Sequence, residues 1–303
     1  MDQSPSIQAP LNPLNRLAEY AELVKFEHTV FALPFALSAM ILAPGPNSWP
    51  NLITLCWVLL AMVGGRTYAM AVNRLLDAAI DAKNPRTQDR AIPAGRVSMT
   101  EGIGLTLMAA GLFTFATFQL PLICQLLLPV AFFILTLYSI AKRFTSLCHL
   151  ILGVALGSSA VGGWLAVTGE FSWLPVIFGF AVVFWVAGFD IIYACQDTEF
   201  DATQDLHSIP VRYGLNGALW ISKGLHTLTV LFLVLFGLLY PGLGPLYWLA
   251  ITITTGILLY EHWLVRPKAT VKETLAHVDA AFFTLNGRIS VLMFALILFD
   301  KFL

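Results

Sequence analysis

Charged residues are scarce in this sequence, since Asp, Glu, Lys and Arg together make up only 12% of its 303 residues. A soluble globular domain contains about 25%. Hydrophobic residues make up 58% and the mean hydropathy is +0.77. A chain with so little charge cannot cover a surface in water, so the composition indicates a membrane protein. The net charge of −1 also provides no long-range field that would attract a nucleic acid partner.

Cysteine is equally scarce, and no two cysteines form a CxxC pair. The four residues lie in or beside apolar runs and are interpreted as small buried hydrophobes: Cys56, Cys124, Cys148 and Cys195. The beginning of the sequence lacks a basic segment before an apolar core, so we expect no signal peptide. We expect residues 1–26 to form a polar tail and then an amphipathic segment, from Leu11 to Phe26, on the membrane surface.

Long apolar runs, in contrast, are abundant. A helix needs roughly 20 apolar residues to cross a bilayer, and only helices satisfy every backbone polar group over such a length in lipid. The sequence predicts about nine spans, at 27–44, 52–76, 101–119, 121–141, 147–168, 173–196, 217–240, 244–264 and 279–300. We therefore expect an all-α polytopic membrane protein, with residues 27–303 as a single transmembrane domain.

The basic residues between these runs predict the orientation of the spans. The first, third, fifth and seventh connections contain no Lys or Arg. The alternate connections contain all of these: Lys83, Arg86, Arg90, Arg96, Lys142, Arg143, Arg212, Arg266, Lys268 and Lys272. Because Lys and Arg accumulate in cytoplasmic loops, we expect a cytoplasmic N-terminus and a C-terminus on the opposite side.

Acidic residues gather at two equivalent places, both on the predicted cytoplasmic side. Asn73, Asp77 and Asp81 recur every four residues, so on a helix they share one face. Asp197 and Asp201 are likewise four apart at the end of the sixth span. Taken singly, carboxylates at helix ends usually face water. Two such clusters at matching positions instead favour a hard-oxygen site for Mg²⁺, which binds with substrate phosphates.

An ionisable residue lies deeper on each of these two helices. Arg66 is seven residues before Asn73, and Asp190 is seven before Asp197. The spacing places each about 10 Å further into the bilayer. A charge there is expected to face a cavity or a partner, so Arg66 either binds the carboxylate of a small acid or forms a buried pair with Asp190.

Basic residues near the acidic clusters complete the predicted site. Arg86, Arg90, Lys142 and Arg143 could grip phosphate oxygens, although Lys-Arg after a span is also the ordinary cytoplasmic signal. Acidic, metal-binding and basic groups at one mouth together indicate a diphosphate site. The rival class is a transporter, since intramembrane charges and two related halves also suit substrate passage. The aspartates cluster at the cytoplasmic ends of the predicted helices rather than at the middle of the membrane, which favours an enzyme over a transporter.

Three motifs resemble a known family in content and order. "NRLLDAAID" at 73–81 with "RTQDRAIPAG" at 86–95 is similar to the first signature of the UbiA superfamily of intramembrane prenyltransferases. "YSIAKR" at 138–143 and "DIIYACQDTEFD" at 190–201 resemble its other elements. "KFEHTVFALPFAL" at 25–37 and "LHSIPVRYG" at 206–214 resemble a 4-hydroxybenzoate polyprenyltransferase-like branch, which includes enzymes that act on dihydroxynaphthoate.

The resemblance implies helices around a central cavity and Mg²⁺-dependent transfer of a polyprenyl group from its diphosphate to an aromatic acid in quinone biosynthesis. It also implies metal ligands, diphosphate-binding residues, an acceptor-binding residue, Arg66, and catalytic residues close to the reacting atoms. The implied metal ligands are Asn73, Asp77, Asp81, Asp197 and Asp201. The implied diphosphate-binding residues are Arg86, Arg90, Lys142 and Arg143. The implied catalytic residues are Asp190, Tyr138 and Tyr193. Arg74 stands where the family often has an Asp, so the site either has one carboxylate fewer or uses Arg74 on the diphosphate.

The acceptor stays open between 4-hydroxybenzoate and a dihydroxynaphthoate, and a chlorophyllide, a heme or a lipid glycerol are further rivals. An arginine that pairs a carboxylate favours an aromatic acid. The family resemblance and the positive-inside pattern together place the protein in a bacterial cytoplasmic (inner) membrane, with the site mouth on the cytoplasmic side.

Overall fold

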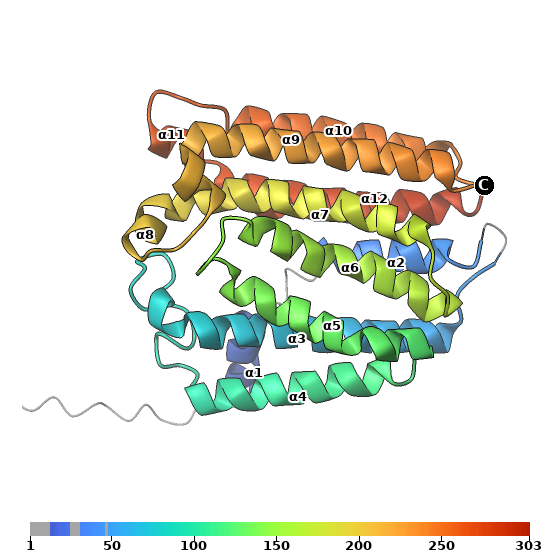
Figure 1. Cartoon of the computed structure of the whole chain (residues 1–303), viewed down its shortest axis with the longest axis horizontal. Coiled ribbons are helices and arrows are strands. Elements are labelled where there is room, and N and C mark those ends of the chain that lie inside the picture. Colours follow the sequence, from blue (N-terminus) through green and yellow to red (C-terminus); the bar gives the residue numbers. More distant parts are fainter. Residues whose placement is uncertain (1–12, 25–30, 46–47) are drawn as a thin grey trace, which may run out of the picture.

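The computed structural model describes residues 13–24, 31–45 and 48–303. Within this part all regular secondary structure is helical (Figure 1). The main helices are α1 (Pro13–Leu23), α2 (Leu33–Leu42), α3 (Leu52–Asp81), α4 (Met99–Thr117), α5 (Leu122–Ala141), α6 (Cys148–Thr168), α7 (Trp173–Ala194), α9 (Ile209–Leu239), α10 (Pro245–Leu264) and α12 (Asn286–Asp300). Short elements join them: a 3₁₀ turn (Cys195–Asp197), α8 (Thr198–Thr203), α11 (Val271–Leu275) and a π-helix (Ala280–Leu285).

Seven helical segments are long and apolar enough to cross a membrane: Leu52–Asp81, Met99–Thr117, Leu122–Ala141, Cys148–Thr168, Trp173–Thr203, Ile209–Leu239 and Ala281–Asp300. Each predicted apolar run coincides with a helix over its described residues. However, α2 has only 10 residues, and α10 is less apolar because it contains Glu261 and His262. An integral membrane protein is confirmed, whereas the number nine is not established.

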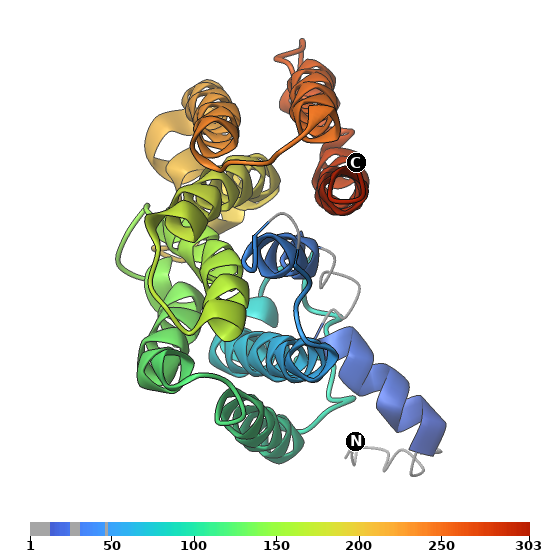
Figure 2. The ribbon, with the colours of Figure 1, turned by 90° about the vertical axis from the view of Figure 1, so that its right-hand side faces the viewer.

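The predicted amphipathic segment is partly visible. Residues 13–23 form α1, whereas residues 1–12, 25 and 26 lie outside the described residues, as does the start of the first predicted span at 27–30. Seen down the bundle, the long helices are end-on while α1 lies across their direction (Figure 2). Arg96 ties α1 to the connection 82–98, because its guanidinium bonds Glu19 and Glu22 at 2.8 Å each.

The helices pack in a sequence that surrounds a cavity. Contacts run from α4 through α3, α5, α6, α7, α9, α10 and α12 to α2, which also packs against α6. Small residues allow the closest approaches: a Cβ on Gly153 of α6 would lie 2.4 Å from the carbonyl oxygen of Val183 on α7. Without a hydrophobic drive between helices in lipid, such contacts hold a bundle together by van der Waals packing.

All connections that carry Lys or Arg lie at one end of the bundle, on the left in Figure 1. We call this the charged end; it comprises residues 82–98, 142–147, 195–208 and 265–279. The opposite end carries the short connections and the C-terminus, where Gly169 ends α6 with a φ of 68°. The predicted alternation of connections with and without Lys or Arg therefore places the two kinds of connection at opposite ends of the bundle.

Two predicted boundaries differ from the structure. The helix α9 begins at Ile209 rather than at 217, but Gly214 interrupts it with a φ of 67° and a ψ of 175°. The sixth predicted span ends at 196, whereas α7 ends at Ala194 and is followed by the 3₁₀ turn Cys195–Asp197 and then by α8. Asp190 therefore lies on α7, Asp197 at the end of the 3₁₀ turn and Asp201 on α8.

Candidate active site

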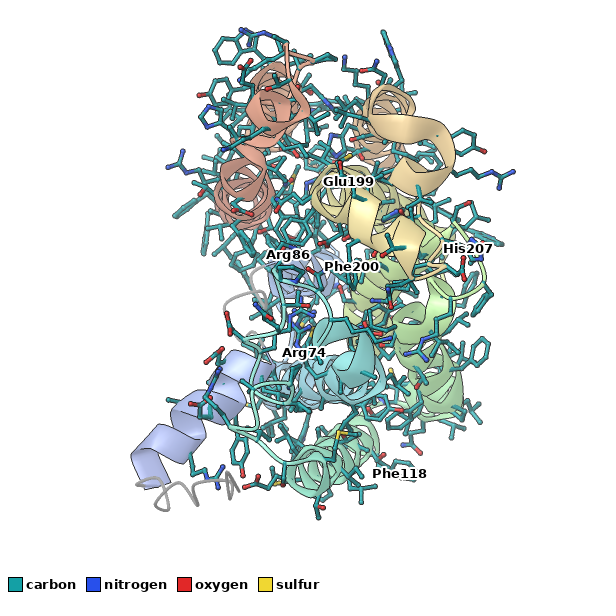
Figure 3. All side chains as sticks on the ribbon, turned by 90° about the vertical axis from the view of Figure 1, so that its left-hand side faces the viewer. Arg74, Arg86, Phe118, Glu199, Phe200 and His207 are labelled. Atoms are coloured by element: carbon teal, nitrogen blue, oxygen red, sulfur yellow. The ribbon has the colours of Figure 1, made fainter. Side chains whose placement is uncertain are left out.

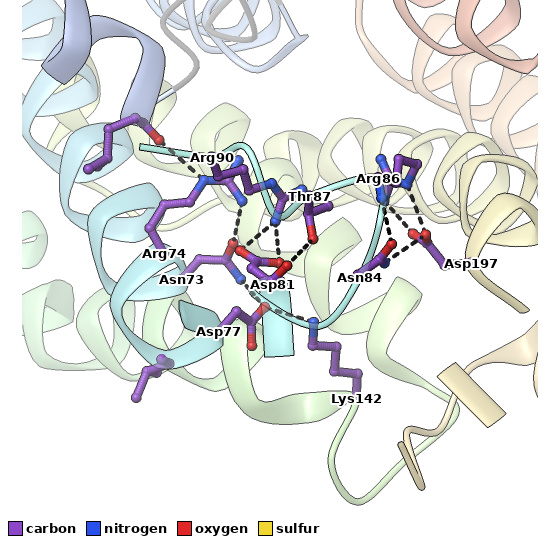
Figure 4. Close-up of polar contacts among 12 residues, drawn as sticks. Asn73, Arg74, Asp77, Asp81, Asn84, Arg86, Thr87, Arg90, Lys142 and Asp197 are labelled. Atoms are coloured by element: carbon purple, nitrogen blue, oxygen red, sulfur yellow. Dashed lines mark hydrogen bonds and ion pairs between the residues drawn. The ribbon is translucent and has the colours of Figure 1, made fainter. Parts of the chain in front are cut away.

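The first acidic region is the end of α3, where two carboxylates are almost completely buried. Asp77 is 2% exposed and Asp81 is 4% exposed. Lys142 approaches Asp77 with its Nζ 2.7 Å from Oδ2, and Arg90 Nη1 lies 2.7 Å and 2.8 Å from the two oxygens of Asp81 (Figure 4). A buried carboxylate is retained only when it is paired, so each acid has its own cation.

Asn73 and Arg74 extend this network towards the cavity. Asn73 donates to Asp77 Oδ2 at 3.2 Å, and its own oxygen accepts from Arg74 Nη1 at 3.4 Å. Arg74 also donates from Nε to the carbonyl of Leu23 on α1 at 3.3 Å. The guanidinium that replaces the family's usual carboxylate is thus buried in the cavity wall and linked to α1.

The second acidic region meets the first directly. Arg86, which follows α3, donates from Nε to Asp197 Oδ1 at 2.8 Å, and its Nη2 pairs with the other oxygen. Asn84 also donates to Asp197, at 3.2 Å. Burial lowers the pKa of Arg86, but the hydrogen bonds and charge of Asp197 outweigh burial and raise this pKa overall. Arg86 lies at the middle of the charged end in Figure 3.

Arg143 and Asp201 lie at the margin of this network. Arg143 donates from Nη2 to the carbonyl of Leu76 at 2.6 Å and lies 3.4 Å from Asp77 Oδ1. Asp201 is on α8, and within the part of the chain described it makes no ion pair. The basic residues predicted to hold diphosphate are therefore mostly paired with the carboxylates predicted to hold metal.

Among the described residues, no three His, Cys, Asp or Glu side chains lie close enough together to hold a metal ion. The donor set nevertheless fits Mg²⁺, which usually binds through one or two carboxylates plus substrate phosphates rather than in a protein cage. Carboxylates from two regions, joined by Arg86 and Asp197, supply such donors. Binding would require Lys142, Arg86 and Arg90 to turn from the carboxylates to the phosphates.

A cavity of about 750 Å³ lies beside this network. It is lined by four of the residues that the sequence singled out as acceptor-binding or catalytic: Arg66, Tyr138, Asp190 and Tyr193. Asn73, Arg74, Arg86 and Arg90 also contribute to its wall. The Tyr138 hydroxyl donates to the carbonyl of Ala69 at 3.1 Å, which holds its ring against α3. The cavity is thus continuous with the ionic network at the charged end.

Asp190 has a partner that the sequence did not reveal. Nδ1 of the buried His149 on α6 lies 2.6 Å from Asp190 Oδ2. Its Nε2 accepts a hydrogen bond from the backbone nitrogen of Ile209 at 3.3 Å, so the proton is on Nδ1 and points at the carboxylate. A histidine at the start of an apolar span was the available signal. The alternative of a buried pair between Asp190 and Arg66 is not needed to account for Asp190.

Aromatic side chains form the wall of the cavity opposite α3. Tyr193 stacks on Phe282 with ring centroids 4.2 Å apart and an interplanar angle of 29°. The Tyr193 hydroxyl accepts from Arg86 Nη1 at 2.7 Å, and Phe283 also lines the cavity. Phenylalanines within an apolar span carry no distinctive signal, so the sequence could not identify Phe282 and Phe283.

Several known proteins are similar to this chain in sequence or in structure. The 4-hydroxybenzoate octaprenyltransferase of Vibrio parahaemolyticus is 30% identical over 82% of this chain and 87% of that protein. A UbiA homologue from Aeropyrum pernix is 32% identical, with a TM-score of 0.80 over 90% of this chain and 98% of that one. A UbiA homologue from Archaeoglobus fulgidus bound to DMAPP and Mg²⁺ shares the fold, with 21% identity and a TM-score of 0.72 over 94% and 99% of the two chains.

The family comparison covers most of the described bundle and excludes the transporter alternative. The pattern of the UbiA prenyltransferase family matches residues 32–287, from the start of α2 to the start of α12. The predicted resemblance is confirmed: this integral membrane protein belongs to the UbiA prenyltransferase family.

Proposed function

We propose that this protein transfers a polyprenyl group from a polyprenyl diphosphate to an aromatic acid, with 4-hydroxybenzoate as the acceptor, in quinone biosynthesis. The observation that carries the proposal is a single cavity that joins Arg66 and Asp190 to the ionic network at the charged end. The similarity to the 4-hydroxybenzoate octaprenyltransferase of Vibrio parahaemolyticus supports the same acceptor.

The diphosphate would bind at the network where the two acidic regions meet. Asp77, Asp81, Asp197, Asp201 and Asn73 are the proposed Mg²⁺ ligands. When bound, the metal would neutralise the negative charge that develops on the leaving diphosphate. The four basic residues that now pair with or border the carboxylates would then bind phosphate oxygens, with the arginines suited to bidentate contacts: Arg86, Arg90, Lys142 and Arg143.

This exchange of partners has a simple electrostatic basis. Three carboxylates are each paired with at least one cation: Asp197 with Arg86, Asp81 with Arg90, and Asp77 with Lys142 and Arg143. An incoming metal–diphosphate complex carries both signs of charge, so each protein group can replace a protein partner with a ligand partner. The network can open without leaving a buried charge uncompensated, which would cost about 3–5 kcal/mol.

The acceptor would occupy the deeper part of the cavity. Arg66 would pair with its carboxylate and fix the ring position, which lowers the barrier by proximity. Asp190, held by His149, would orient or deprotonate the phenol. The faces of Tyr138 and Tyr193 would stabilise the developing allylic cation.

The proposed reaction balances as a simple substitution. The allylic C–O bond breaks and its electron pair leaves with the diphosphate. A ring carbon beside the phenol oxygen forms the new C–C bond and then loses its proton, so the products are prenylated acid, pyrophosphate and one proton. The apolar wall of Phe282 and Phe283 would keep water from the cation.

The substrate and the basic connections favour one setting for the reaction. A polyprenyl tail is most stable in lipid, and Lys and Arg are concentrated at the charged end. We infer that this end faces the cytoplasm of a bacterial inner membrane and that residues 27–303 act as one domain.

The test uses the purified full-length protein in detergent with geranyl diphosphate and a panel of aromatic acids. Prenylated 4-hydroxybenzoate and an equal amount of pyrophosphate should form with Mg²⁺, stop with EDTA and resume when Mg²⁺ is restored. A dihydroxynaphthoate in the panel tests the rival acceptor. Absence of any prenylated acid, with the protein folded and Mg²⁺ present, would refute the proposal.

A further inference from the structure

A second polar network lies inside the bundle, away from the ionic network of the charged end. Glu261 on α10 and Asn286 on α12 are both 0% exposed. Trp185 on α7 donates from Nε1 to Asn286 Oδ1 at 2.6 Å, and Asn286 Nδ2 lies 3.4 Å from each oxygen of Glu261. A carboxyl group buried inside a protein is costly unless it is hydrogen-bonded, so a fully buried glutamate with an amide partner indicates a specific role.

This network is attached to an unusual backbone feature. Asn286 directly follows the π-helix Ala280–Leu285, and its Nδ2 also donates to the carbonyl of Ala281 at 2.9 Å. A π turn is less regular than an α turn and occurs frequently at functional sites. Asn286 therefore connects Glu261 and Trp185 to the backbone of this turn.

The π turn carries two side chains into the cavity. Phe282 and Phe283 line it, and their rings contact each other edge-on with centroids 4.6 Å apart. Phe282 stacks on Tyr193, whose hydroxyl accepts from Arg86 at the diphosphate site. A continuous series of contacts thus runs from Glu261, through Asn286 and the π turn, to the ionic network.

We propose that Glu261 and Asn286 are positioning residues that hold the π turn, so that Phe282 and Tyr193 cover the allylic carbon and exclude water. They would determine whether the prenyl group is transferred to the aromatic acid or lost to hydrolysis. The inference rests on the proposed prenyl transfer. In hydrolysis the same C–O bond breaks, water supplies the new C–O bond, and prenyl alcohol, pyrophosphate and a proton result.

The experiment measures how the products divide between prenylated acid and geraniol. Full-length protein in detergent is supplied with Mg²⁺, geranyl diphosphate and 4-hydroxybenzoate. Asn286→Leu and Glu261→Leu should lower the ratio of transfer to hydrolysis about tenfold, a difference of ~1.4 kcal/mol between the two barriers. Glu261→Gln keeps an acceptor oxygen for Asn286 and should restore the wild-type ratio.

Two variants separate positioning from a general loss of stability. Tyr247 lies on α10, as Glu261 does, and Tyr247→Phe removes its buried hydrogen bond of 2.7 Å to the carbonyl of Leu233 on α9, so it should lower the Tm but leave the product ratio unchanged. Phe282→Leu alters the wall directly and should reproduce the shift towards geraniol even if Asn286→Leu does not fold.

The outcomes distinguish this inference from the proposed function. Wild-type protein that forms no prenylated acid would overturn the proposed function. Wild-type protein that transfers normally, together with folded Asn286→Leu, Glu261→Leu or Phe282→Leu proteins whose product ratio is unchanged, would overturn the positioning role alone. Equal shifts in Glu261→Gln and Glu261→Leu would also contradict it.

Discussion

The two acidic regions look like copies in the sequence but differ in the structure. At the end of α3, Asp77 and Asp81 lie on one uninterrupted helix of 30 residues and are buried with cations of their own. After α7, Asp197 ends a 3₁₀ turn and Asp201 lies on the short helix α8, and the partner of Asp197 is Arg86 from the connection that follows α3. The first region is therefore organised before any ligand binds, whereas the second depends on contacts supplied by the first.

The largest effect should come from Asp77→Ala in the organised region. It removes a proposed metal ligand and leaves Lys142 without its ion pair, so we expect prenyl transfer to fall at least about 10³-fold, or ~4 kcal/mol. The measurement is formation of prenylated acid at saturating substrates. Asp300→Asn is the matched control, since this carboxylate at the opposite end accepts a hydrogen bond from Leu246 at 2.9 Å; it should keep near-normal transfer. Near-normal turnover in Asp77→Ala would contradict the metal assignment.

The second largest effect should come from removal of the ion pair between Arg86 and Asp197, which links the two acidic regions. Arg86→Ala deletes the pair with Asp197 and one proposed phosphate contact, so we expect a loss of roughly 10²-fold in kcat/KM for the diphosphate. Because both side chains act together, the effects of Arg86→Ala and Asp197→Ala should not add in the double variant. Additive effects would show that the two regions work independently.

A third comparison concerns the residues that lie deeper in the bundle, Arg66 on α3 and Asp190 on α7. Arg66→Ala should raise the KM of the aromatic acid about 10- to 100-fold, because a hydrogen bond to a charged group contributes about 1.5–3 kcal/mol. The KM of the diphosphate should stay unchanged. Steady-state kinetics with each substrate varied in turn provide the test, and the opposite pattern of KM values would move Arg66 to the diphosphate.

The corresponding residue on α7 is Asp190, and His149 on α6 holds its carboxylate. His149→Phe removes the donor to Asp190, and we expect kcat to fall about tenfold, which is less than the 10²–10⁴-fold that an acid–base group contributes in full. His149→Gln can still donate a hydrogen bond and should recover part of this loss. Equal activity of the Phe variant and the wild type would show that His149 only fills space.

The smallest effect concerns stability in the absence of ligands. Asp81→Ala leaves Arg90 unpaired and should lower the Tm measurably, whereas Asp201→Ala should change the free energy of unfolding by no more than about 0.5 kcal/mol. Adding Mg²⁺ and a diphosphate analogue should stabilise the wild type and not Asp201→Ala. A large loss of stability in ligand-free Asp201→Ala would remove the proposed difference between the regions.

Much of the architecture could be predicted because it depends on local patterns. The apolar runs had to become helices in lipid, and the four-residue spacing placed Asn73, Asp77 and Asp81 on one face of α3. The alternation of Lys and Arg predicted which connections share an end. The 3₁₀ turn at Cys195–Asp197 could not be predicted, since its residues are compatible with a continuing α-helix.

The sequence by itself determined a helical membrane protein of the UbiA family, with its acidic and basic residues at one end. These properties follow from hydropathy, periodicity and motif spacing, which act over a few neighbouring residues. Only the tertiary structure decided the partners: Arg86 with Asp197, His149 with Asp190, and Glu261 with Asn286 beside the π turn. Such pairs join residues 25 to 111 positions apart, and only the packing of the helices brings their side chains within hydrogen-bond distance.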